Sequence, residues 1–170
     1  AGYFDAVAGL PCRMVGWSTN NPKRHNLLEE LCEEIGNAHK ENEPKSYAFQ
    51  LSKSHKDYLM GDSPYSTLTL NYDFRTACHI DRGDLKNSLS TLTILEEIED
   101  NYSGCYLGLP EYKIALNVKS GDTLIFDAHE FHANTEMKVL SDKLPINDLT
   151  GESFGGRISI VAYLRVNCRS

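Results

Sequence analysis

Two histidines and one aspartate in this chain have the types and the spacing of metal ligands. His79 and Asp81 are separated by one residue, and His132 follows much later. If residues 78–81 end a strand, as the β-type run at 65–70 indicates, His79 and Asp81 point to the same side, because side chains alternate along a strand. Two imidazoles and one carboxylate around one face of an octahedron suit ferrous iron and leave the opposite face open for an organic co-substrate and dioxygen. The three residues therefore predict an iron site of the kind that an oxygenase needs.

His129 is an alternative third ligand, since it lies three residues before His132. A strand would place the two histidines on opposite faces, so only one of them should bind the metal. We prefer His132 because Asn134 and Thr135 follow it. A zinc pair formed by both histidines on a helix is a further alternative, but residues 121–126 have the pattern of a turn followed by a strand, which argues against a helix.

An arginine and a serine on another predicted strand could bind the organic co-substrate. The run that begins at Arg157 alternates, and one face carries Arg157, Ser159, Val161 and Tyr163. A buried guanidinium requires an anion, and its planar fork matches a carboxylate through two hydrogen bonds. The far carboxylate of 2-oxoglutarate meets that requirement. An ordinary salt bridge at a strand end is the alternative interpretation of Arg157.

Four segments of the chain together resemble a known enzyme family. They hold the His-x-Asp pair, a Gly-Cys-Tyr strand, the later histidine and the Arg-x-Ser strand, at residues 71–84, 104–112, 121–135 and 157–161. The stretch from Asn71 to Arg165 resembles the double-stranded β-helix dioxygenases that depend on iron and 2-oxoglutarate, and more closely the TET/JBP branch, which oxidises the 5-methyl group of pyrimidines in nucleic acids. The last histidine of that family usually precedes Gly-Asn, whereas Ala133 stands between His132 and Asn134 here.

The resemblance implies a fold and a reaction. The fold would be mainly β with a flanking helix, arranged as a double-stranded β-helix (jelly-roll or cupin-like) barrel. His79, Asp81 and His132 would hold Fe(II), and Arg157, helped by Ser159, would bind 2-oxoglutarate. Dioxygen would then convert 2-oxoglutarate to succinate while a C–H bond of the substrate is oxidised.

The same resemblance implies DNA as the partner, with the 5-methyl group of cytosine or thymine as the target. A base inside a duplex cannot reach the interior of a barrel, so it must be flipped out of the stack. Three polar residues near the expected pocket are candidates for binding that base: Asn71, Arg75 and Asn134.

The overall charge of the chain argues against a nucleic-acid partner. The net charge is -7, with 24 acidic against 17 basic residues, whereas phosphate binding requires a basic surface. Two alternatives therefore stay open. One is the same oxygenase chemistry on a small metabolite or a protein side chain, and the other is a cupin-like barrel that binds a ligand or metal without turnover. Loss of a metal ligand or of Arg157 would indicate the second alternative, and neither loss is seen.

Length and composition predict one domain. With 170 residues and 41% hydrophobic content, we expect a single unit over 1–170, with an N-terminal supporting helix region at 1–60 and a barrel core at 61–170. No apolar stretch approaches the ~20 residues of a membrane span. Five dispersed cysteines without Cys-x-x-Cys spacing indicate reduced thiols in an intracellular protein, nuclear or, for a viral or bacterial source, cytoplasmic. The sequence carries no signal for an oligomeric state.

The local patterns predict where the elements lie. Asn21 and Pro22 predict the start of a helix whose apolar stripe runs to Ile35, with Gly36 weakening its end. A long loop beside the pocket mouth is expected between residues 136 and 156. Strands are expected at 65–72, 75–81, 89–95, 104–109, 112–118, 122–127 and 157–166.

Overall fold

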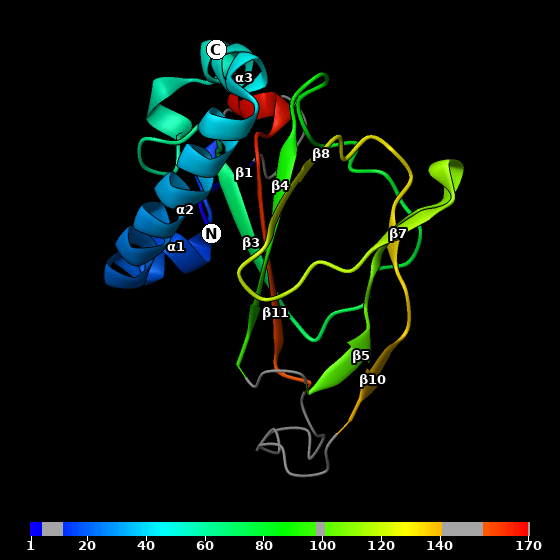
Figure 1. Ribbon diagram of the computed structural model, residues 1–170. Helices are drawn as coiled ribbons and strands as arrows, with labels where there is room; N and C mark the ends of the chain where they lie inside the picture. Colours follow the sequence, from blue (N-terminus) through cyan, green and yellow to red (C-terminus); the bar gives the residue numbers. More distant parts are fainter. Residues whose placement is uncertain (5–11, 98–100, 141–154, 170) are drawn as a thin grey trace.

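The structure is a computed structural model that describes residues 1–4, 12–97, 101–140 and 155–169 (Figure 1). Within these ranges the α-helices are α1 (Gly16–Asn20), α2 (Pro22–Asn42) and α3 (Pro44–Lys53), and the 3-10 helices are η1 (Lys56–Tyr58), η2 (Pro110–Tyr112) and η3 (Val166–Cys168). The strands are β1 (Tyr3–Phe4), β2 (Arg13–Met14), β3 (Thr67–Tyr72), β4 (Ser90–Glu96), β5 (Tyr102–Gly104), β6 (Leu107–Leu109), β7 (Ile114–Leu116), β8 (Thr123–Phe126), β9 (Ala133–Asn134), β10 (Met137–Val139) and β11 (Arg157–Tyr163).

A four-stranded antiparallel sheet with the order β3-β11-β4-β8 is the main wall of the molecule. Smaller sheets, β7-β6-β9 and β10-β5, form a second wall across from it (Figure 1). A cavity lies between the two walls, because it is lined by residues of the main sheet and also by Leu107 of β6 and Asn134 of β9. This mainly β architecture with flanking helices is the class that was predicted.

The central strand β11 separates the apolar core from the cavity. Ile160 and Ala162 point to one face, where they pack with Cys32 and Ile35 of α2 in a buried cluster. Arg157 and its neighbours at every second position point to the other face and line the cavity. The predicted alternation of this strand is therefore confirmed, and its physical cause is the two-residue period of a strand with a helix on one side.

Helix α2 continues beyond its predicted end. It runs through Gly36 to Asn42, and a Cβ added at Gly36 would lie 3.1 Å from the Cβ of Ser63. Glycine therefore permits close packing of the helix against the chain at Ser63 and does not end the helix. Asn21 occupies the predicted N-cap position without a side-chain capping bond, and its amide instead donates to the carbonyl of Trp17 at 2.9 Å.

The strand predicted at 75–81 is wrong, because the chain leaves β3 in a loop. Asp73 has a left-handed backbone with a φ of 49°, and its carboxylate accepts hydrogen bonds from the backbone N–H groups of Gly155 at 2.6 Å and Arg157 at 2.8 Å. This clamp turns the chain toward the start of β11. His79 keeps only an isolated bridge to His132. The strand expected at 104–109 is likewise divided into β5 and β6 at Cys105, which has a φ of 55°.

The expectation that all five cysteines are free thiols is also wrong. The structure joins Cys12 and Cys168 in a disulfide, while Cys32, Cys78 and Cys105 are free. The first and last parts of the chain meet in a small core cluster with Leu164, a proximity that cysteine spacing alone does not reveal.

Two further expectations concern the long loop between residues 136 and 156 and the absence of a membrane span. Most of the loop expected between residues 136 and 156 lies outside the described residues, at 141–154. Within the described ranges, every helix is too short or too polar to cross a membrane.

Candidate active site

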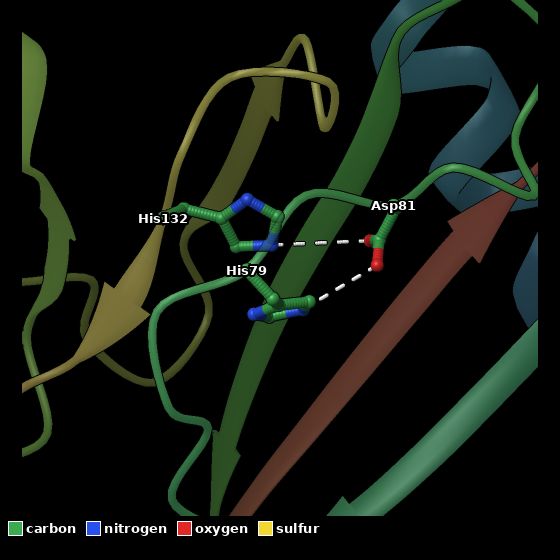
Figure 2. Close-up of side chains that lie close together, drawn as sticks. All are labelled: His79, Asp81 and His132. Atoms are coloured by element: carbon green, nitrogen blue, oxygen red, sulfur yellow. Dashed lines mark ion pairs between the residues drawn. The ribbon is translucent and has the colours of Figure 1, made fainter.

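His79, Asp81 and His132 converge on one point at the cavity (Figure 2). The Nε2 atom of His79 lies 3.3 Å from Oδ1 of Asp81, and the Nε2 atom of His132 lies 3.8 Å from Oδ2 of the same carboxylate. One ligand atom from each residue falls within 4.8 Å of the others. Among the described residues, these three form the one cluster of His, Cys, Asp or Glu side chains that could hold a metal ion.

The backbone fixes the imidazoles in the tautomer that a metal requires. Nδ1 of His79 lies 2.8 Å from the carbonyl of Ala77, and Nδ1 of His132 lies 2.8 Å from the carbonyl of Glu130. A carbonyl oxygen can only accept, so each Nδ1 carries the hydrogen and each Nε2 keeps a lone pair. Two nitrogen lone pairs and a carboxylate then face one another, and a cation between them fits this set of donors.

Long-range backbone hydrogen bonds bring the three residues together. The N–H of His79 donates to the carbonyl of His132 and the N–H of His132 donates back to His79, both at 3.0 Å. The N–H of Asp81 donates to the carbonyl of Ala128 at 2.8 Å. The His-x-Asp segment is therefore held against the segment before β9 although neither part is a regular strand at that point.

His129, the alternative third ligand, is engaged elsewhere. Its Nδ1 lies 3.1 Å from Oδ1 of Asp127, and its backbone N–H donates to the same oxygen at 2.9 Å. The converging group contains His132 and does not contain His129.

The cavity has a volume of about 310 Å³, and its lining includes Arg157, the first residue of β11. Arg157 is only 2% exposed and Ser159 only 6%. Among the ion pairs of the described residues, none involves the guanidinium of Arg157. An arginine buried without a carboxylate is costly unless an anion binds there. This arrangement does not match the alternative of an ordinary salt bridge at a strand end.

The three residues proposed to bind a base do not share one environment. Asn71 and Asn134 line the cavity, whereas Arg75 is exposed and is not part of its wall. The side-chain oxygen of Asn134 accepts a hydrogen bond from the backbone N–H of Thr76 at 3.4 Å. Asn134 therefore also holds the loop that precedes His79.

Several residues of the cavity wall were not predicted from the sequence. Asp84 and Arg165 form a second polar end of the cavity, beside Tyr163. Asp84 is 5% exposed and accepts a hydrogen bond from the hydroxyl of Ser90 at 2.9 Å. Burial raises the pKa of Asp84 to about 7, above its ordinary value of 3.8. Only Tyr163 had a sequence signal, since it shares the inward parity of Arg157.

Comparison with known proteins defines the class of this domain. A sequence model described as "Oxygenase domain of the 2OGFeDO superfamily" matches residues 1–166. The chain belongs to this Tet_JBP family of oxygenase domains, as the sequence patterns predicted.

Curated relatives carry the domain within much longer proteins. The bifunctional helicase and thymine dioxygenase JBP2 of Trypanosoma brucei brucei (strain 927/4 GUTat10.1) is 34% identical over 173 residues, which cover 99% of this chain and 15% of JBP2. The thymine dioxygenase JBP1 of Trypanosoma brucei brucei is 33% identical over 168 residues, covering 97% of this chain and 19% of JBP1. The chain thus spans less than a fifth of the length of these relatives.

A solved structure shares the fold. NgTET1 in complex with 5mC DNA superposes with a TM-score of 0.73 at 14% sequence identity, covering 100% of this chain and 61% of that chain. At this identity the likeness shows the fold alone, and it confirms the expected double-stranded β-helix class.

Replacing His132 with Ala should abolish tight binding of a divalent metal, because the variant keeps only two of the three converging donors. His129→Ala is the matched control and should bind metal like the wild type, since His129 faces Asp127. Calorimetric titration with Mn²⁺ or anaerobic Fe(II) measures both affinities. If the His132 variant binds metal normally and the His129 variant does not bind it, His129 and not His132 is the third ligand.

Replacing Asp84 with Asn should stabilise the metal-free protein at neutral and alkaline pH. Because the pKa of Asp84 is raised in the folded state to about 7, the wild type loses stability as the pH rises from about 4 to 7. Asn keeps an acceptor for Ser90 without a charge, so the gain should be roughly 2–4 kcal/mol above pH 7 and vanish below pH 4. Urea unfolding at pH 4 and pH 8 measures it, with the exposed Asp62→Asn as control. An equal effect of Asp84→Asn at both pH values would contradict this.

Proposed function

We propose that this domain holds Fe(II) through His79, Asp81 and His132 and uses 2-oxoglutarate and O₂ to oxidise the 5-methyl group of a pyrimidine base in DNA. The observation that carries this proposal is the cavity itself. A three-donor group that suits ferrous iron opens into the same space as a buried arginine that has no ion pair among the described residues. Because Arg157 lines the same cavity as the metal group, it is the candidate partner for the far carboxylate of a co-substrate that chelates the metal.

The residues of the chain have separate roles in this reaction. Arg157 binds the far carboxylate of 2-oxoglutarate through a bidentate pair of hydrogen bonds, and the hydroxyl of Ser159 donates a further hydrogen bond. The carbonyls of Ala77 and Glu130 keep both imidazoles oriented. Bound iron and 2-oxoglutarate supply oxidation of a C–H bond by O₂, with release of succinate and CO₂.

The other end of the cavity suits the edge of a pyrimidine. A carboxyl group and a guanidinium, at Asp84 and Arg165, line the cavity past the end of β11 that lies farthest from Arg157. Pyrimidine edges present N–H donors and carbonyl acceptors, which these two groups can pair with. Leu92 and Phe126 supply apolar surface in the same wall. The names of the curated relatives favour thymine over 5-methylcytosine as the target.

Part of the acidic charge of the chain lies away from the cavity and is therefore compatible with DNA binding there. Helix α2 carries acidic side chains and packs on the face of the main sheet opposite the cavity. The cavity wall itself carries three arginines and two aspartates, one of which is a proposed metal ligand. These residues are Arg82, Arg157, Arg165, Asp81 and Asp84.

The decisive experiment is mass spectrometry of nucleosides after incubation of DNA with the protein, Fe(II), 2-oxoglutarate and O₂. Thymine-containing duplexes with and without 5-methylcytosine serve as parallel substrates, and Asp81→Ala serves as the inactive control. We expect 5-hydroxymethyluracil that depends on 2-oxoglutarate. If no base is oxidised while a small molecule or peptide stimulates succinate formation, the substrate is not DNA. If nothing stimulates it, the barrel only binds ligands.

Replacing Arg157 with Met should raise the 2-oxoglutarate concentration needed for half-maximal turnover by about 30-fold or more, since losing a buried charge-assisted pair costs roughly 2–5 kcal/mol. Metal affinity should stay unchanged, because Arg157 is not part of the metal group. Arg24→Met, an exposed arginine on α2, is the matched control. An unchanged co-substrate requirement in the Arg157 variant would assign the carboxylate to another cation.

A further inference from the structure

Two arginines of the cavity lining come from segments whose backbones meet near Asp84. Arg82 and Arg165 both line the cavity, and Arg82 is exposed. The guanidinium of Arg165 packs on Gly83, since a Cβ added there would lie 2.4 Å from Nη1 of Arg165. The N–H of Val166 also donates to the carbonyl of Gly83 at 3.0 Å. The backbone next to Arg82 is therefore held against Arg165 and the residue that follows it.

Phe4 extends this arrangement to a third arginine. The guanidinium carbon of Arg165 lies 4.5 Å from the centre of the Phe4 ring, within the range of a cation–π contact. Phe4 is paired with Arg13 across the antiparallel strands β1 and β2, and residues directly opposite each other project from the same face. The same shallow hollow is lined by Phe4 and Arg13. Arg165 thus links the cavity that it lines with Arg82 to the hollow lined by Phe4 and Arg13, and we call these four residues the arginine rim.

The rim is unusual in a chain with a net charge of -7. Arg13 and Arg82 are both exposed, and no ion pair of the described residues involves either of them. The carboxyl group of Asp84 is buried in the cavity wall and accepts a hydrogen bond from Ser90. Exposed cations that are grouped together repel one another, and a bound anion relieves that repulsion.

We propose that Arg13 and Arg82, the two exposed arginines of the arginine rim, bind the phosphates of the DNA strand on either side of the flipped nucleotide. The inference rests on the proposed function, which places a DNA base in the cavity. A nucleotide that swings into the cavity brings its flanking phosphates to the edge of the opening. Guanidinium groups match phosphate oxygens through paired hydrogen bonds. Arg13 and Arg82 contact phosphate, and Phe4 is a positioning residue that holds the guanidinium of Arg165 between them.

The test measures DNA binding by fluorescence anisotropy, using protein loaded with metal and 2-oxoglutarate under anaerobic conditions so that no turnover occurs. The variants are Arg13→Glu and Arg82→Glu, and the matched control is Lys23→Glu, which makes the same charge change at an exposed position of α2. We expect each rim variant to weaken binding of a thymine-containing duplex at least 10-fold at low salt. The plot of log affinity against log salt should also become shallower by about 0.9 for each phosphate that the variant no longer neutralises. Lys23→Glu should change neither quantity.

A second variant separates positioning from charge. Phe4→Leu keeps an apolar side chain but removes the ring face beneath Arg165, so DNA affinity should fall several-fold without a change in net charge. Metal affinity and circular dichroism should match the wild type in every rim variant, which excludes unfolding as the cause.

The outcomes distinguish the rim from the function of the domain. If the wild type oxidises thymine in DNA while Arg13→Glu and Arg82→Glu bind DNA with unchanged affinity and salt dependence, the rim proposal is wrong and the proposed function stands. If Lys23→Glu weakens binding as much as the rim variants do, the effect is one of overall charge and the rim proposal is again wrong. If the wild type neither binds nor oxidises DNA, the proposed function fails and the rim proposal fails with it.

Discussion

The candidate site depends on one reciprocal pair of backbone hydrogen bonds, between His79 and His132. These bonds join two segments that are distant in sequence, and neither segment is part of a longer ladder at that point. They set the two imidazoles 4.3 Å apart between ring centroids, with Asp81 facing both. Because each ring also donates through Nδ1 to a nearby carbonyl, the backbone itself fixes the geometry of the candidate metal site. Such preorganisation reduces the conformational entropy that the side chains would lose on binding a metal.

The second constraint is the position of β11 at the centre of the main sheet. One strand supplies both the apolar face that packs on α2 and the polar face that carries Arg157 and Ser159. A shift of β11 by one residue would exchange these faces, so the hydrophobic packing of Ile160 and Ala162 also holds the register of Arg157 and Ser159, the residues proposed to bind the co-substrate. Asp73 adds a lock at the start of this strand by accepting hydrogen bonds from its first backbone N–H groups. Stability and ligand binding are thus coupled through the same strand.

The distribution of charge is as important as its total. The overall acidity of the chain suggested a partner other than nucleic acid. Helix α2, which carries five glutamates, packs on the face of the main sheet opposite the cavity, whereas the cavity lining includes three arginines. Long-range electrostatic attraction depends on the local field at an opening more than on net charge. The proposed DNA substrate and the surface around the cavity are therefore compatible.

The sequence by itself predicted the family, the fold class, the strand period of β11 and the three residues that converge at the candidate metal site. These features depend on residue type and short-range spacing, which a single chain displays directly. It could not determine how His79 and Asp81 are held, because that depends on bonds to His132 and Ala128 and not on the strand expected at 75–81. Asp84 and Arg165 likewise became recognisable only through burial and through contacts between distant segments. The disulfide between Cys12 and Cys168 and the arginine rim arise in the same way, since the tertiary structure alone brings the start of the chain against its end.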